Sequence, residues 1–162
     1  MSTAIRAAVI TASDACSRGE RADDSGAALV ELLESCGAEI VEKSIVPDDL
    51  ELLVWTLAEL SERENINLIM TTGGTGLGPR DNTPEATLQV IQRDVPGIAE
   101  AIRAESLKVT PMAMISRGVA GVASGTLIIN LPGSPKAVRE SFAVIKPVLA
   151  HAVDLMAGHT RH

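Results

Sequence analysis

The sequence predicts an α/β domain built on a mostly parallel sheet, and two observations support this. Short apolar runs alternate with amphipathic helical stretches along the chain, which is the pattern of right-handed βαβ units. Polar loops that contain glycine follow three of these runs, at 12–25, 73–82 and 132–136. Ligands of such sheets bind outside the carboxyl ends of the strands, so the loops mark the expected site. The 162 residues fit one domain spanning 1–162.

Four runs are predicted to be strands: 5–11, 38–46, 68–72 and 126–131. The first is a short apolar run that opens into polar residues, which is typical of a buried strand. Pro47 ends the second run, and Pro132 with Gly133 breaks the fourth. Proline lacks the N–H that a continuing strand would need.

Helices are predicted over 29–36, 50–60, 84–93, 97–109 and 135–156. In the first, second and last of these, apolar residues recur at the spacing of one helix face. Asp48, Thr83 and Ser134 are the predicted N-caps, and Gly37 is expected to end the first helix. Residues 111–125 are rich in small side chains and give no clear prediction.

Composition and charge exclude several classes of partner. The net charge is −7, whereas a nucleic-acid or anionic-membrane surface is usually basic. Aromatic residues make up 1% of the chain and are limited to Trp55 and Phe142. The chain therefore has almost no aromatic side chains on which nucleobases could stack. No apolar run approaches the length of a membrane span. We therefore expect no nucleic-acid partner, no membrane association and a cytoplasmic location.

The cysteines and histidines exclude several kinds of chemistry. Cys16 and Cys36 form no CxxC motif, which argues against a disulfide framework or a zinc site. His151, His159 and His162 all lie in the last twelve residues, so a Ser/His or Cys/His mechanism is not expected. The chemistry must then use carboxylates, hydroxyls, backbone amides, basic side chains or a bound metal ion.

The strongest local signal is the glycine-rich loop TTGGTGLGPRD at 71–81. Glycines permit positive φ and a close approach of the backbone to a ligand, and successive amides can form a nest for an anion. The loop is not a Walker A motif, because Pro79 stands where that motif has lysine. The candidate phosphate-binding residues here are Thr72, Gly73, Gly74, Thr75 and Gly76. A flexible strand-to-helix turn remains the alternative interpretation.

Acidic residues stand beside these loops. Asp81 follows the glycine-rich loop and Asp48 stands near a strand end, so each is a candidate Mg²⁺ ligand. A helix cap for either residue, or an ion pair between Asp81 and Arg80, is the alternative. The loop after the first strand could hold a nucleotide or a metal, or its polar groups could only cap helices. Lys136 near a helix start suggests an anion, and a solvated lysine is equally consistent.

These motifs together resemble the Mog/MoaB family of molybdopterin adenylyltransferases, which act in molybdenum cofactor biosynthesis. The matching segments, in order, are TASDACSRG (11–19), DDSG (23–26), Pro47-Asp48, TTGGTGLGPRDNTPEAT (71–87), Ser116-Arg117 and IINLPGSPKA (128–137). The resemblance covers essentially the whole chain. It implies a three-layer αβα sandwich, usually assembled as a trimer. Asn82 departs from the apolar residue or threonine that is frequent in the family.

The resemblance also implies a reaction and roles for residues. The terminal phosphate of molybdopterin would attack the α-phosphate of ATP with Mg²⁺ as cofactor, giving adenylyl-molybdopterin and pyrophosphate. Asp48 and Asp81 would be the catalytic and metal-binding acids. Molybdopterin or phosphate would contact Thr72, Gly73, Gly74, Thr75, Gly76, Ser116, Pro132, Gly133, Ser134 and Lys136. The nucleotide would contact Ser13, Asp14, Ser17, Gly19, Asp23 and Ser25.

Two alternatives to an enzyme of this kind remain open at the level of sequence. The first is a molybdopterin-binding carrier or regulatory paralogue without catalytic activity. The second is the related domain of competence-damage proteins, which normally accompanies another domain. The expected macromolecular partners are further copies of this chain and the enzyme that inserts molybdate.

Overall fold

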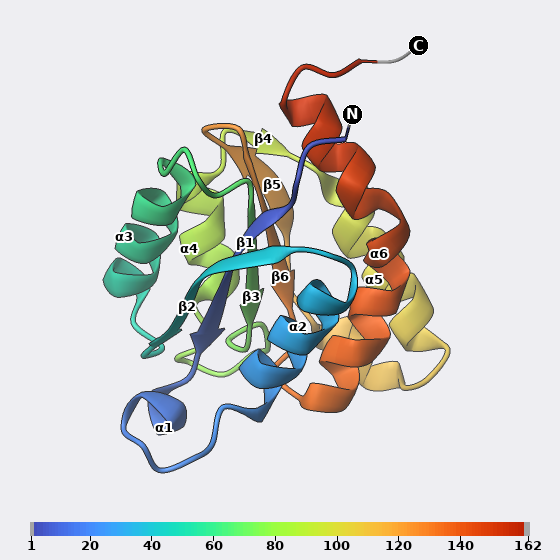
Figure 1. Cartoon of the computed structure of the whole chain (residues 1–162). Helices are drawn as coiled ribbons and strands as arrows, with labels where there is room; N and C mark the ends of the chain where they lie inside the picture. The colour runs from blue at the N-terminus through green and yellow to red at the C-terminus, as the bar shows by residue number, and fades with distance from the viewer. Residues whose placement is uncertain (1, 161–162) are drawn as a thin grey trace.

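The computed structural model describes residues 2–160 and contains a six-stranded sheet in the order β2-β1-β3-β6-β5-β4 (Figure 1). The strands are β1 (Arg6–Ala12), β2 (Glu39–Val46), β3 (Leu68–Thr72), β4 (Arg93–Asp94), β5 (Ala120–Ala123) and β6 (Thr126–Leu131). Strands β2, β1, β3 and β6 pair in parallel, whereas β5 is antiparallel to both β6 and β4. The predicted mostly parallel sheet is therefore confirmed.

Helices cover both faces of the sheet, which gives the three expected layers (Figure 1). The helices are α1 (Asp14–Ser17), α2 (Asp24–Ser35), α3 (Leu50–Ser61), α4 (Thr83–Val90), α5 (Pro96–Leu107), α6 (Pro135–Met156) and the 3₁₀ helix η1 (Pro111–Ile115). Helices α2, α5 and α6 supply residues to one apolar cluster, and α3 and α4 supply residues to the other. The αβα sandwich is thus confirmed.

The two clusters share the sheet, because successive side chains of a strand point to opposite faces. Val9 and Met70 pack with α2, α5 and α6, whereas Ile10 and Ile69 pack with α3 and α4. All four side chains are fully buried. Phe142 of α6 fills the first cluster, so the core is almost entirely aliphatic, as the composition predicts.

Three predicted element boundaries are wrong. Asp48 does not cap α3; Oδ1 of Asp49 accepts the hydrogen bond from the N–H of Leu52, at 2.9 Å. Asn82, not Thr83, is the N-cap residue of α4. Helix α4 ends at Val90, because the chain then turns to pair β4 with β5 in the sheet. A two-residue strand has no periodicity that a sequence could reveal.

A further difference is that α1 and the first residues of α2 lie in the segment 12–25, which was predicted to be a loop. The remaining predicted boundaries lie within two residues of those in the structure. Strands β3 and β6 have the predicted limits. Gly37 has a φ of +83° beyond α2, and Oγ of Ser134 accepts the hydrogen bond from the N–H of Ala137 at the start of α6. The segment 111–125, which gave no prediction, contains η1 and β5.

The carboxyl ends of the four parallel strands lie at one edge of the sheet, where α1 and the glycine-rich loop are found (Figure 1). The three polar loops of the sequence therefore converge there. Within residues 2–160, no helix has the length and apolarity needed to cross a bilayer.

Large apolar side chains are exposed at the end of α5 and along η1. They are Leu107, Val109, Met112, Met114 and Ile115. We expect this surface to be covered by self-association, as a trimer, when molecular mass is measured by light scattering at micromolar concentration. Met114→Glu should weaken the assembly, whereas Trp55→Glu, on exposed α3, should not. A monomeric parent protein would contradict this prediction.

Candidate functional site

The loops after β1, β3 and β6 enclose a cleft of about 420 Å³ at the carboxyl edge of the sheet. The loop after β2 adds Asp48 to its wall. The lining residues are Thr11, Ala12, Ser13, Cys16, Arg21, Ala22, Asp24, Ser25, Asp48, Thr72, Gly73, Gly74, Gly133, Ser134 and Pro135. The sequence pattern thus located the cleft, although it did not single out Thr11 or Arg21 as site residues.

The glycine-rich loop is held in a defined shape. Gly73 and Gly74 have φ values of +92° and +67°, a region that favours glycine. A Cβ on Gly73 would lie 2.4 Å from the carbonyl oxygen of Ala12, and one on Gly74 would lie 2.3 Å from Oγ1 of Thr83. Oγ1 of Thr83 also donates to the carbonyl of Gly73, at 2.9 Å. The loop is therefore packed tightly against both β1 and α4.

Arg117 supports the far side of the same loop. Its Nε donates to the carbonyl of Gly76 and its Nη2 to the carbonyl of Asp81, each at 2.8 Å. Its backbone N–H donates to the carbonyl of Thr75, also at 2.8 Å, and its guanidinium pairs with Glu85. Sequence reasoning gave Arg117 no role; its place beside Ser116 in a matching segment was the available signal.

Asp48 lines the cleft, and one of its carboxylate oxygens has no hydrogen-bond partner among the described residues. Its Oδ2 accepts from the backbone N–H of Asp14 at 2.9 Å. Its Oδ1 is buried and has no hydrogen-bond partner within residues 2–160. Burial raises the pKa of the Asp48 carboxyl, and the negative charges of Asp14 and Asp81 act in the same direction. A buried acceptor without a partner is costly, so Oδ1 is suited to bind a ligand.

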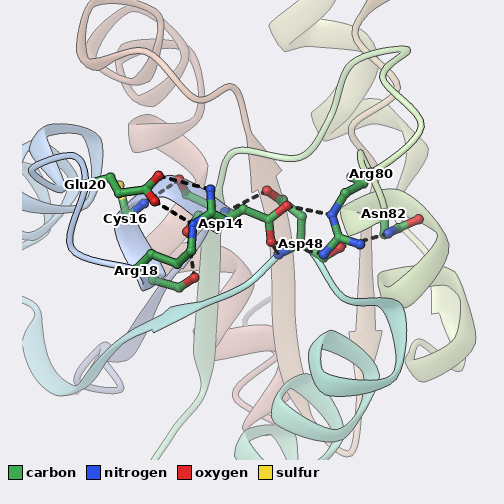
Figure 2. A network of polar contacts seen from close by, with 9 residues as sticks. Asp14, Cys16, Arg18, Glu20, Asp48, Arg80 and Asn82 are labelled. Carbon is green, nitrogen blue, oxygen red and sulfur yellow. Dashed lines mark hydrogen bonds and ion pairs between the residues drawn. The ribbon is translucent and has the colours of Figure 1, made fainter.

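The side chain of Asp14 points toward both Asp48 and the guanidinium of Arg80 (Figure 2). Its Oδ1 accepts from the backbone N–H of Asp48 at 3.0 Å. Arg80 donates from Nε to Oδ2 at 2.6 Å and from Nη2 to Oδ1 at 3.0 Å. This contact holds the pKa of Asp14 below its ordinary value. The ion pair considered between Arg80 and Asp81 is replaced by one between Arg80 and Asp14.

Asp81 lies in the glycine-rich loop, where its Oδ2 accepts from the N–H of Gly78 at 2.8 Å. A Cβ on either Gly76 or Gly78 would lie 2.9 Å from this oxygen. Asn82, next along the chain, donates from Nδ2 to the carbonyl of Asp48 at 3.2 Å. The two predicted acids therefore belong to one connected group of loops.

These carboxylates fit a magnesium ion that arrives with a phosphate ligand. Among residues 2–160, no three Asp, Glu, His or Cys side chains converge as a complete metal cage. Mg²⁺ in enzymes is usually held by one or two carboxylates, substrate phosphates and water. The unpartnered Oδ1 of Asp48 is a donor of the right kind.

Most polar groups of the loop after β1 stabilise local structure. Ser13 caps α1, Ser17 donates to the carbonyl of Asp14, and Asp23 caps α2. Asp23 also accepts from Oγ1 of Thr11, and Gly19 has a φ of +71°. Of the predicted nucleotide contacts, Ser13 and Ser25 line the cleft, whereas Asp14, Ser17, Gly19 and Asp23 stand outside its lining.

Five predicted molybdopterin-binding residues lie outside the lining of the cleft: Thr75, Gly76, Ser116, Pro132 and Lys136. Ser116 and Pro132 instead line a neighbouring cavity of about 190 Å³ between α5, η1 and α6. The carbonyl of Pro132 accepts from Oγ1 of Thr72 at 2.7 Å, which connects the two cavities. Lys136 is exposed, with its Nζ 3.8 Å from Oε1 of Glu140.

Replacing Cys16 with serine is expected to change turnover by less than about twofold. Cys16 lines the cleft, but the described histidines lie elsewhere, with His151 on α6 and His159 hydrogen-bonded to Thr3. His162 lies outside the described residues. A cysteine without a base beside it is a poor nucleophile. Initial rates of the Cys16→Ser protein test this; complete loss of activity in a folded variant would instead indicate covalent catalysis.

The fold and the cleft define an α/β domain whose polar, glycine-bearing loops line a cleft at the carboxyl edge of the sheet. Comparison with known proteins identifies the class further. The chain belongs to the family described as "Probable molybdopterin binding domain", whose sequence profile matches residues 8–151. The resemblance predicted from the motifs is confirmed.

Individual relatives agree with this assignment. The chain is 41% identical to a molybdopterin adenylyltransferase of Helicobacter pylori strain J99 over 157 residues, which cover 96% of this chain and 89% of the relative. It is 44% identical to the molybdenum cofactor synthesis protein cinnamon of Drosophila melanogaster over 149 residues. That match spans 91% of this chain and 25% of the longer fly protein.

Solved structures show the same architecture. The molybdopterin biosynthesis enzyme MoaB of Thermus thermophilus has a TM-score of 0.89 at 48% identity, with 95% of this chain and 97% of that chain covered. The Mog protein of Mycobacterium ulcerans also has a TM-score of 0.89, at 41% identity, with 97% and 99% covered.

Proposed function

We propose that the chain is a molybdopterin adenylyltransferase of molybdenum cofactor biosynthesis. An oxygen of the terminal phosphate of molybdopterin attacks the α-phosphorus of ATP; the bond from that phosphorus to the bridging oxygen breaks, and pyrophosphate leaves. The observation that best supports this is Oδ1 of Asp48, which has no partner among the described residues and lies beside Gly74 in the glycine-rich loop. Relatives named for this activity share up to 41% of their residues with the chain.

The residues of the cleft are suited to bring two anions together. The amide of Gly74 can bind a phosphate oxygen without adding a positive side chain, whereas the N–H of Gly73 already donates to the carbonyl of Leu131 at 3.2 Å. Ser134 and Pro135, at the start of the long helix α6, also line the cleft, and the helix dipole favours an anion there. The attacking phosphate is already ionised at neutral pH, so no histidine base is needed. Positioning and charge neutralisation therefore provide much of the rate.

Magnesium would be held by Asp48, with Asp81 as the second acid, and would neutralise charge on the phosphates. Asp48 has the better placed oxygen, because its Oδ1 has no partner within residues 2–160, whereas Oδ2 of Asp81 accepts from Gly78. Asp48 would therefore act at the reacting centre. Asp81 would bind magnesium as the second acid and would in addition stabilise the glycine-rich loop through Gly78.

Incubation of the purified protein with molybdopterin and Mg-ATP tests the proposal. We expect mass spectrometry to detect adenylyl-molybdopterin together with one pyrophosphate for each product molecule. Omitting Mg²⁺, or replacing ATP with an analogue that has a non-cleavable α,β-bridge, should abolish the product. Binding of molybdopterin without any transfer of AMP would identify the chain as a carrier or regulatory protein instead.

A further inference from the structure

Asp14 and Asp48 occupy equivalent places on neighbouring strands. Ala12 of β1 pairs with Val46 of β2, and each aspartate stands two residues beyond its strand end. The two residues exchange hydrogen bonds: the N–H of Asp14 donates to Oδ2 of Asp48, and the N–H of Asp48 donates to Oδ1 of Asp14. The orientation of the Asp48 carboxylate is therefore fixed by the backbone of the other loop.

The two carboxylates differ in which oxygens remain available. Both oxygens of Asp14 already accept hydrogen bonds, from Arg80 and from the N–H of Asp48. Oδ1 of Asp48 has no partner among the described residues. It lies 3.2 Å from the position that a Cβ on Gly74 would occupy. Of the two carboxylates, only that of Asp48 has a buried oxygen without a partner among the described residues, and this oxygen lies beside Gly74.

Arg80 connects the glycine-rich loop to this pair. Its guanidinium engages Asp14 in a two-bond contact, and the side chains are 59% and 23% exposed. An exposed ion pair of this kind contributes little to overall stability. Its two-bond geometry does fix the carboxylate plane. The placement of Asp48 thereby depends on a residue of the loop that surrounds the phosphate site.

We propose that Asp14 is a positioning residue for Asp48, held by Arg80, and not a nucleotide contact. This inference rests on the proposed function for its kinetic consequence. Arg80 orients Asp14, Asp14 accepts the N–H of Asp48 and donates its own N–H to Oδ2, and Oδ1 of Asp48 is left directed at the ligand. Arg80 of the glycine-rich loop thus acts on Asp48 through Asp14 of the loop after β1.

Asp14→Asn, Arg80→Gln and the double variant test this arrangement, with Arg18→Gln as the matched control. Arg18 pairs with Glu20 on the same loop and is equally exposed, at 59%. The first measurement is amide hydrogen exchange by NMR on the metal-free, ligand-free proteins. We expect Arg80→Gln to accelerate exchange of the Asp48 amide by about tenfold, because transient opening limits exchange, and Arg18→Gln to leave it unchanged.

The second measurement separates kcat from KM for ATP. Each single variant should lower kcat by roughly tenfold, since small displacements of a reacting group are costly, while KM for ATP stays within about twofold. The double variant should be no slower than the slower single variant, because both act on Asp48 along one chain of contacts. Arg18→Gln should match the parent protein. Circular dichroism melting confirms that every variant is folded.

Three outcomes would overturn the inference. A large rise in KM for ATP with kcat retained would make Asp14 a nucleotide contact. Multiplicative losses in the double variant would show that Arg80 and Asp14 act independently. Unchanged exchange of the Asp48 amide in both single variants would show that the pair does not hold Asp48. A parent protein that transfers no AMP would refute the proposed function, and the exchange measurement would still decide the positioning role.

Discussion

Asp48→Asn is expected to lower the turnover of molybdopterin adenylylation by roughly 100-fold or more, as for the loss of one preorganised electrostatic group. Asparagine keeps the shape of the side chain and one oxygen that can accept from the N–H of Asp14. It removes the charge that Oδ1 would present to a metal ion. Affinity for molybdopterin should change little, because the glycine nest is intact. Single-turnover kinetics and fluorescence titration of molybdopterin measure the two effects separately.

Asp81→Asn serves as the matched comparison for Asp48→Asn. Its side chain can still accept from the N–H of Gly78 through the remaining oxygen. We therefore expect slower turnover that is partly restored by high Mg²⁺ concentration, with molybdopterin still bound. A folded Asp48→Asn protein that turned over like the parent would remove Asp48 from the reacting centre. If the turnover of the Asp81→Asn protein at low Mg²⁺ concentration equalled that of the parent, the role of Asp81 would be limited to stabilising the glycine-rich loop.

Gly74→Val is expected to destroy phosphate binding and to destabilise the protein. Valine at a φ of +67° carries a backbone strain of about 1–3 kcal/mol. Its Cβ would also approach Oγ1 of Thr83 to 2.3 Å, and that hydroxyl is committed to the carbonyl of Gly73. Since about 1.4 kcal/mol corresponds to tenfold in affinity, we expect molybdopterin binding to weaken by more than tenfold. Calorimetry and thermal unfolding measure both consequences.

Gly125→Val is the control for the cost of positive φ alone. Gly125 has a φ of +78° in the turn between β5 and β6, and a Cβ there would meet nothing within 4 Å among the described residues. This variant should lose stability and keep its affinity for molybdopterin. Equal affinity of the Gly74→Val protein and the parent would mean that the glycine-rich loop is only a turn.

Local chemistry explains why much of the fold could be predicted from the sequence. The apolar runs of β3 and β6 are bounded by glycine and proline, so their limits were predicted correctly. Proline at N1 and serine at the N-cap gave the start of α6 in the same way. The errors occurred where tertiary pairing overrides local pattern. Strand β4 exists because β5 supplies its hydrogen-bond partners. The sequence of two residues does not show which distant segment will pair with them.

The sequence by itself determined that three polar loops follow strands of a mostly parallel sheet, and that Asp48 and Asp81 stand in or beside these loops. That the glycines bind an anion stays a prediction. Only the tertiary structure decided which carboxylate oxygens are free. Asp14 is hydrogen-bonded to Asp48, which is 34 residues away in the sequence, and to Arg80, which is 66 residues away. These hydrogen bonds depend on β1 lying between β2 and β3 in the sheet. Hydrogen bonds between distant segments follow from strand order and register, which local residue patterns do not specify.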